Sequence, residues 1–292
     1  MNPQGMYGSA DDHGGMPPES QKSPTDLDVP EGAGGGRHVR RSVDVRRLVA
    51  RLSRLTSLSG EWVLFLLMLA AGLVVMASAT WAAGEIYESV HDRSGLAAVD
   101  RPVLDRMVQW RQPWLDSVMT AFTTIGGTVV LPIITSVVVL FLAWRWRSWL
   151  PVALTVFAAS GSVAMTVIGK QTVGRVRPAH EFAVPPFEVS PSFPSGHSLN
   201  AVVVVGVLVY LLMVRERRLA RRRTLLLFLA VYSVCMGLSR VYLGHHWLTD
   251  VLTGWLLGGA WLVFVVMTHR FVATLERARR RREAHGVVDS PA

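Results

Sequence analysis

The chain is divided by long hydrophobic runs that carry no charged residue. They lie at residues 62–83, about 119–143, 148–168, 198–214, 224–238 and 251–268. A helix needs about 20 apolar residues to cross a bilayer, and a backbone in hydrocarbon must satisfy its own hydrogen bonds, so each run predicts one helix. The fifth run is short and needs flanking residues to span. The pattern predicts an all-α fold, a six-helix transmembrane bundle.

The composition is typical of a membrane protein and indicates a polar or basic tail at each end of the chain. Half of the residues are hydrophobic, and the mean hydropathy is +0.33. Residues 1–36 are rich in Gly, Pro, Ser and Asp, too polar to form a core, so we expect disorder there. Arginines interleaved with Val and Leu at 37–54 suit a membrane surface. We therefore predict a cytoplasmic disordered and Arg-rich tail at 1–60, a six-span domain at 61–270 and a cytoplasmic basic tail at 271–292.

The arginines predict the orientation in the membrane. With six spans, the segments 37–54, 145–147, 215–223 and 270–282 fall on one side and together hold 21 Arg. The positive-inside rule places this side, with both termini, in the cytoplasm. The net charge of +9 thus comes largely from residues that would meet anionic lipid, which argues against nucleic acid as a partner. The single cysteine excludes a disulfide within one chain.

The outward segment 239–250 gathers ionisable residues beside the membrane, where they are costly unless paired or solvated. It contains an Arg, two His and an Asp. His246 and Asp250 are four residues apart and would share a helix face if the last helix begins near Trp247. Such a carboxylate can fix the tautomer of an imidazole that acts as nucleophile or base. The ordinary alternative is a polar helix start with a first-turn acid.

A second outward segment carries basic residues and a helix-start motif. Lys170, Arg175 and Arg177 lie on the side where basic residues are scarce. Snorkelling at a helix end is the ordinary explanation for each of them. The segment ends in Pro-Ser-Gly-His at 194–197, directly before the fourth predicted helix. Ser and Gly at a helix start offer a cap and free N–H groups that can point at an anion.

Together these segments resemble the type 2 phosphatidic acid phosphatase superfamily of membrane lipid phosphatases, which is related to the haloperoxidases. Its three motifs occur in order. The first is Lys170 through Arg177-Pro178, the second is Pro194-Ser195-Gly196-His197, and the third is Ser239-Arg240 with His246 and Asp250. Two positions depart from the usual pattern: His245 stands where an aliphatic residue is common, and Leu248 where Pro is common.

The resemblance implies a phosphate-binding site made of side chains and backbone. Lys170, Arg177 and Arg240 would form a positive clamp, with Arg able to grip two phosphate oxygens at once. The Ser195 hydroxyl and the Gly196 N–H would add donors. Cationic side chains would then stabilise the charge of the transferred phosphoryl group, so the resemblance implies no metal and no cofactor.

The resemblance also implies the catalytic roles. His246 would attack phosphorus to give a phosphohistidine, and Asp250 would orient it. His197 would protonate the leaving oxygen and then activate water. Arg175 is expected to be secondary, and His180 and His245 to be neighbours of the site without a catalytic role. Asp105, Arg106 and Arg111 could rim the pocket, although a solvated amphipathic helix is the ordinary explanation for them.

The expected function is an integral membrane phosphatase acting on a lipid monophosphate or diphosphate at the outer membrane face. Candidate substrates are phosphatidic acid, phosphatidylglycerophosphate and a polyprenyl diphosphate. One alternative is transfer of the phosphoryl group to a lipid or sugar acceptor. A non-catalytic phospholipid binder or transporter is another, although binding alone would not need His246, Asp250 and His197. A vanadate-dependent peroxidase is disfavoured, since those relatives are soluble.

Overall fold

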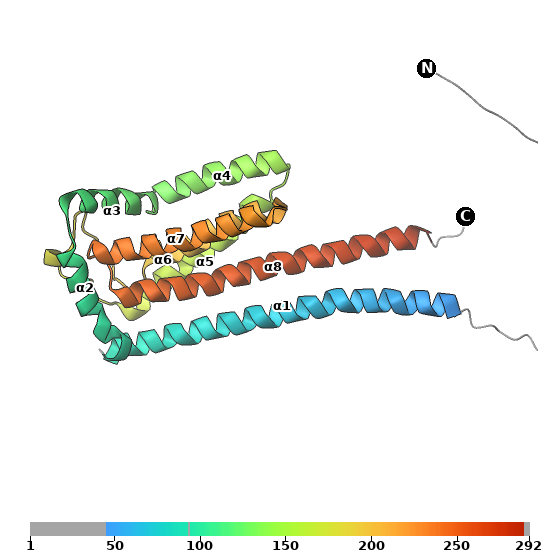
Figure 1. Ribbon diagram of the computed structural model, residues 1–292, viewed down its shortest axis with the longest axis horizontal. Coiled ribbons are helices and arrows are strands. Elements are labelled where there is room, and N and C mark those ends of the chain that lie inside the picture. Colours follow the sequence, from blue (N-terminus) through green and yellow to red (C-terminus); the bar gives the residue numbers. More distant parts are fainter. Residues whose placement is uncertain (1–44, 93, 289–292) are drawn as a thin grey trace, which may run out of the picture. The chain divides into compact units, whose positions relative to one another are not determined.

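The computed structural model describes residues 45–92 and 94–288. This part of the chain is all helical, as predicted (Figure 1). In chain order the elements are α1 (Val45–Asp92), the short 3-10 helix η1 (Gly95–Val99), α2 (Asp100–Gln109), α3 (Pro113–Ile125), α4 (Val130–Trp146), α5 (Leu150–Val173), the short 3-10 helix η2 (His180–Phe182), α6 (Gly196–Arg215), α7 (Leu219–Tyr242) and α8 (Leu248–Val288).

The hydrophobic runs form helices long enough for a membrane. Five helices of the described chain meet the length and hydropathy of a span, or six if the bent pair α3 and α4 is one span. The bend of 47° falls where Gly126 caps α3 and Gly127 continues the turn through an N–H bond to the Thr124 carbonyl. The short run at 224–238 does recruit its flanks, because α7 extends over Leu219–Tyr242. The count of six spans stays a prediction.

The chain divides into two compact units, residues 1–52 and residues 53–292. Of the first, only the start of α1 belongs to the described chain. The expected disordered tail at 1–36 lies outside the described residues, as do residues 289–292. The boundaries expected near 60 and 270 stay predictions, and α1 and α8 each continue through them as one helix.

The core is centred on α6, which contacts α5, α7 and α8. Every fourth residue of α6 faces inward, which is the spacing of one helix face. The buried cluster consists of Leu199, Val203, Val207 and Leu211 of α6 with Leu142, Leu154, Ala158 and Val265 of α4, α5 and α8. Glycines bring α8 close to the start of α6. A Cβ on Gly254 would lie 2.8 Å from the Ser195 carbonyl oxygen, so no larger residue fits.

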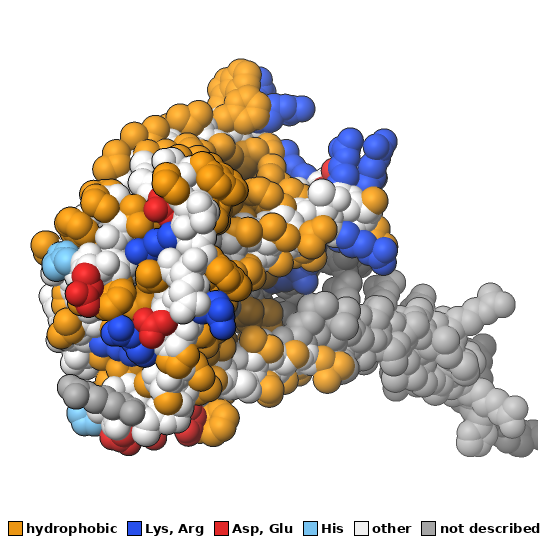
Figure 2. All heavy atoms as spheres, turned by 60° about the vertical axis from the view of Figure 1, so that its left-hand side comes forward, with side chains coloured by type: hydrophobic (Ala, Val, Ile, Leu, Met, Phe, Trp, Pro, Cys, Tyr) orange, Lys and Arg blue, Asp and Glu red, His pale blue; other side chains and the backbone are white. Residues whose placement is uncertain are grey.

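Polar groups collect at one end of the second unit. Figure 1 shows α2 crossing the ends of the long helices there, and α2 contacts both α7 and α8. Figure 2 shows basic, acidic and histidine side chains gathered on this end, with hydrophobic side chains over the helix flanks. Large residues such as Trp144 and Phe141 are exposed on those flanks, as expected where helices face lipid tails.

Candidate active site

Backbone hydrogen bonds join the three motif-bearing segments at this end. The Ser195 N–H, at the start of α6, donates to the Asp250 carbonyl oxygen in the first turn of α8 at 3.0 Å. In the loop 174–195, the Val184 N–H donates to the carbonyl oxygen of Leu243, just after α7, at 2.9 Å. The site is therefore assembled from helix ends and one loop, all held by main-chain contacts.

His246 and Asp250 lie side by side although only Asp250 is helical. The helix α8 begins at Leu248, and the Asp250 carboxylate caps it by accepting from the Trp247 N–H at 2.9 Å. The same Oδ2 atom lies 3.4 Å from His246 Nδ1. That distance is close for an ion pair once the ring is protonated, but Nδ1 makes no aligned hydrogen bond.

The other ring nitrogen of His246 faces a cation. Nε2 lies 3.2 Å from Arg177 Nη1. Arginine has only N–H donors, so Nε2 is the acceptor and the ring proton lies on Nδ1, toward Asp250. Burial holds the pKa of His246 well below its usual value, and the charges of Arg177 and Arg240 lower it further. The imidazole is therefore neutral at neutral pH, with a lone pair on Nε2.

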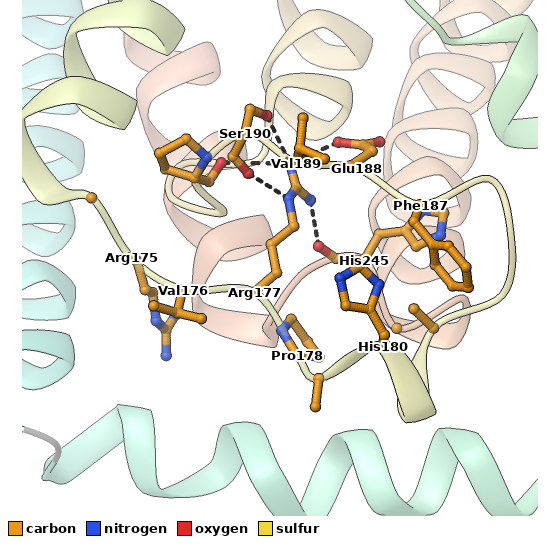
Figure 3. A pocket seen from close by; sticks show the side chains of 15 residues that line it. Arg175, Val176, Arg177, Pro178, His180, Phe187, Glu188, Val189, Ser190 and His245 are labelled. Carbon is orange, nitrogen blue, oxygen red and sulfur yellow. Dashed lines mark hydrogen bonds and ion pairs between the residues drawn. The ribbon is translucent and has the colours of Figure 1, made fainter.

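Two guanidinium groups converge beside this lone pair on one carboxylate. Glu188 forms an ion pair with Arg177 Nη2 at 2.7 Å and accepts a hydrogen bond from Arg240 Nη2. The second donor group of Arg240, Nη1, is held by the Thr123 hydroxyl of α3 at 3.1 Å. Figure 3 shows Arg177 at the centre of the loop, pointing toward Glu188 and Ser190.

Glu188 is an anion in this position. Burial alone would raise its pKa, but Arg240 and Arg177 outweigh that effect and, with smaller contributions from His246 and His197, lower the pKa to about 2. The two guanidinium groups of Arg177 and Arg240 therefore meet at one point, the Glu188 carboxylate. A phosphate group placed there would meet the same partners.

Lys170 is fastened to the loop. Its ammonium donates to the Ser190 hydroxyl at 3.0 Å and to the Pro191 carbonyl oxygen. Arg177 reaches the same Ser190 hydroxyl at 3.2 Å. Lys170 and Arg177, seven residues apart in sequence, are thus brought together by a single side chain that the sequence motif does not include.

The second motif forms the start of α6. Ser195 is the N-cap, and its completely buried hydroxyl accepts from the Ser198 N–H at 3.4 Å and from the Ser198 hydroxyl at 2.9 Å. Gly196 opens the helix, where backbone N–H groups have no intrahelical partner. His197 follows, and a Cβ on Gly127 would lie 3.8 Å from its Nε2. The bend between α3 and α4 therefore approaches this histidine.

Arg175 turns to the opposite side of the loop from Arg177 (Figure 3). Its Nη1 donates to Asp250 Oδ1 at 2.6 Å, and its Nη2 to Asp100 Oδ2 at 2.7 Å. Sequence reasoning placed Arg175 in a secondary position and did not identify Asp100 or Glu188. Neither acid lies in a motif, and only the folded chain brings them to the site.

The remaining neighbours support the loops. Arg111, predicted to be solvated, donates to the carbonyl oxygens of Phe182 and Tyr242 at 2.6 and 2.8 Å. That prediction is wrong, because the end of α2 turns its guanidinium inward. Burial lowers the pKa of His245 to about 4, with Arg240 adding to the effect. Its Nε2 donates to the Val184 carbonyl oxygen at 2.7 Å.

A cavity of about 430 Å³ opens over the loop. It is lined by loop residues and by the turn after α7, including Arg177, His180, Phe187, Glu188 and His245. In the described part of the chain, no three His, Cys, Asp or Glu side chains are grouped as metal ligands. The cavity lining offers a ligand the guanidinium group of Arg177 and the imidazoles of His180 and His245, which suits an anion.

Known proteins are similar to this chain in sequence and in fold. Residues 148–273 match the PAP2 superfamily. Phosphatidylglycerophosphatase B of Bacillus subtilis (strain 168) is 33% identical over 190 residues, which cover 64% of this chain and 90% of that protein. An undecaprenyl-diphosphatase of Sulfolobus acidocaldarius is 29% identical over 136 residues, 40% of this chain and 61% of that protein. Among solved structures, a transmembrane PAP2-type phosphatidylglycerolphosphate phosphatase from Bacillus subtilis superposes with a TM-score of 0.62 at 30% identity, covering 68% of this chain and 96% of that chain.

Proposed function

Because the chain belongs to the PAP2 superfamily, we propose that it is a metal-independent membrane phosphatase that hydrolyses a lipid phosphate through a phosphohistidine on His246. The observation that carries the proposal is the neutral His246, whose Nε2 lone pair faces Arg177, one of the two cations that hold the Glu188 carboxylate. A phosphoryl group in that position would lie next to a nucleophile and between guanidinium groups that stabilise its charge.

The reaction takes two displacements at phosphorus. In the first, a bond forms between His246 Nε2 and phosphorus as the bond to the lipid oxygen breaks, and His197 gives that oxygen a proton. In the second, His197 removes a proton from water, which attacks phosphorus and releases inorganic phosphate and the free imidazole. Asp250 stabilises the positive ring, since its carboxylate already lies on the Nδ1 side.

Phosphate binding falls to the remaining motif residues. Arg177 and Arg240 exchange Glu188 for phosphate oxygens, and Lys170 adds a third positive charge at the loop. Ser195 retains its own hydroxyl proton for donation, because both of its bonds within α6 are accepted ones. The Gly196 N–H completes the set at a helix start, where anions are stabilised.

Phosphatidylglycerophosphate is the first substrate to test, given the relative that is similar over most of its length. Phosphatidic acid and a polyprenyl diphosphate are the others. We also propose that both termini are cytoplasmic and that the site, within a phosphatase domain at 61–270, lies at the outer face; the arginine distribution supports this orientation. A lipid phosphate could then reach the site from the outer leaflet.

The test is phosphate release by detergent-solubilised protein from the three lipids, with EDTA present. We expect wild-type activity on at least one lipid and a loss of roughly 1,000-fold or more in His246→Asn. His180→Asn is the matched control, because His180 lines the cavity next to Arg177 and has no assigned role in the chemistry. Acid-labile labelled phosphate should be trapped on wild-type protein and not on His246→Asn.

Four results would contradict the proposal. Full activity in His246→Asn would show that His246 is not the nucleophile. Loss of activity in EDTA, restored when metal is added, would show that the reaction depends on a metal. Lipid binding without phosphate release or any labelled protein would indicate a non-catalytic binder. Label that passes from lipid to an added alcohol in preference to water would indicate a transferase.

A further inference from the structure

Arg175 is held between two buried carboxylates that come from distant parts of the chain. Asp250 lies in the first turn of α8 and Asp100 opens α2, and both are almost completely buried. The guanidinium donates one nitrogen to each, at 2.6 and 2.7 Å. Arg175 also donates to the Thr249 hydroxyl at 2.8 Å. The three charged groups form a row that ends at His246.

Asp100 uses both of its oxygens in this row. Oδ1 accepts from the Thr249 N–H at 2.9 Å, and Oδ2 accepts from the Thr249 hydroxyl at 2.6 Å and from Arg175. The Thr249 N–H belongs to the first turn of α8, where backbone donors have no intrahelical partner. Asp100 therefore fixes the guanidinium and the start of the helix that carries Asp250.

We infer that Asp100 is a positioning residue for the phosphoryl transfer, acting through Arg175 and Asp250 on His246. This inference rests on the proposed function and adds a residue to it. Arg175 alone would hold Asp250 in place but would also neutralise it, which would weaken its support for a cationic imidazole. Asp100 balances Arg175, so two carboxylates and one guanidinium leave one net negative charge beside the ring that becomes positive.

A purely structural role for Asp100 predicts a different pattern in a double-mutant cycle. If Asp100 acts through Asp250, its replacement matters only while Asp250 can support His246. If Asp100 merely stabilises the packing of α2 on α8, the two substitutions lower kcat independently and their effects multiply.

The experiment measures kcat and KM on the best lipid for wild type, Asp100→Asn, Asp250→Asn and the double variant. We expect Asp100→Asn to lower kcat by about 10- to 100-fold, with KM changed less than about 2-fold. In the Asp250→Asn background the same change should lower kcat less than about 2-fold. Asp105→Asn is the control, because Asp105 is a half-exposed carboxylate on the same helix that pairs with Arg101, and it should leave both constants unchanged.

A second variant keeps the test decisive if Asp100→Asn does not fold. Arg175→Lys retains the charge, but a single ammonium cannot reach both carboxylates as the planar guanidinium does. Arg175→Lys should lower kcat when Asp250 is present and leave kcat unchanged when it is combined with Asp250→Asn. Equal losses in both backgrounds, a rise in KM alone, or wild-type kinetics in both single variants would overturn the role of Asp100. Inactive wild-type protein would overturn the proposed function, and this role with it.

Discussion

At the scale of single residues, the carboxylate of Glu188 lies in the position proposed for the substrate phosphate. Arg177 and Arg240 both bind it, and its pKa of about 2 keeps it charged. A lipid phosphate would have to displace this internal anion from the same guanidinium groups. Glu188 is therefore expected to act as a competitor of the substrate.

Replacing Glu188 with a neutral residue should tighten binding of the lipid phosphate. We expect Glu188→Gln to lower KM by roughly 5-fold, which corresponds to about 1 kcal/mol, and to strengthen inhibition by vanadate to a similar degree. Glu181→Gln is the control, because Glu181 is an exposed acid of the same loop. Steady-state kinetics over a range of lipid concentrations check the prediction, and a KM that rises in Glu188→Gln contradicts it.

The lowered pKa also fixes the pH dependence of this effect. Because Glu188 stays ionised down to about pH 2, the ratio of the two KM values should be constant between about pH 5 and 8. Its folded-state pKa lies below the ordinary 4.5. The ion pairs of Glu188 therefore contribute fully to the free energy of unfolding above about pH 4.5, and this stabilisation is lost as the pH falls toward 2.

The sequence predicts some of these residues and not others. His246 and Asp250 could be paired from sequence because four residues separate them at the start of a helix. Asp100 lies 150 residues from Asp250, and Glu188 is an ordinary loop acid with no local pattern around it. Only packing of α2 and the loop against α7 and α8 gives these two acids a function.

At the scale of elements, the turn after α7 is held against the loop 174–195. Gly244 has a left-handed φ of 71°, and a Cβ there would lie 1.7 Å from the Phe182 carbonyl oxygen. Gly174, at the start of the loop, has a similar φ of 62° but open space around it. Comparing substitutions at Gly174 and Gly244 therefore separates two free-energy costs of a side chain: the cost of the left-handed backbone conformation and the cost of a steric clash.

Gly244→Ala should therefore destabilise the protein more than Gly174→Ala. Both variants lose about 1–2 kcal/mol to the left-handed conformation, and Gly244→Ala adds about 1–3 kcal/mol for the clash with backbone. Thermal unfolding in detergent measures the difference. Equal shifts in Tm would show that the turn can move away from Phe182.

Hydrophobic runs predict the helices better than they predict helix ends. The runs identify where the helices lie because a membrane requires long apolar segments. They do not show that Gly126 and Gly127 break one run into α3 and α4, or that α8 extends to Val288. Those features depend on turn geometry and on polar residues that hydropathy does not distinguish.

At the scale of the whole molecule, the chain is a multi-pass membrane protein, and the family resemblance drawn from three short motifs is confirmed by relatives that are lipid phosphatases. The motifs could identify the family because their residues and spacing can be read directly from the sequence, without the folded structure. The orientation rests on the uneven distribution of arginine and stays a prediction.

Labelling of single cysteines in intact cells tests this orientation. With Cys235→Ala as background, Val189→Cys should react with a membrane-impermeant maleimide, since Val189 is 99% exposed in the loop predicted to face out. Arg217→Cys, exposed between α6 and α7, should react only after the cells are opened. The reverse pattern would place the site in the cytoplasm.

The loop 174–195 differs from the rest of the site in how many amino-acid substitutions it can tolerate. Under the proposed mechanism, the two histidines and Asp250 stand at or beside the starts of α6 and α8, which the core fixes. The loop supplies Arg177, Glu188 and most of the cavity lining. Surface loops tolerate substitution and insertion better than packed helices do. Substrate preference can therefore diverge, or be engineered, through the loop residues that line the cavity and have no proposed role in the chemistry, while Arg175, Arg177 and the residues at the helix starts are kept.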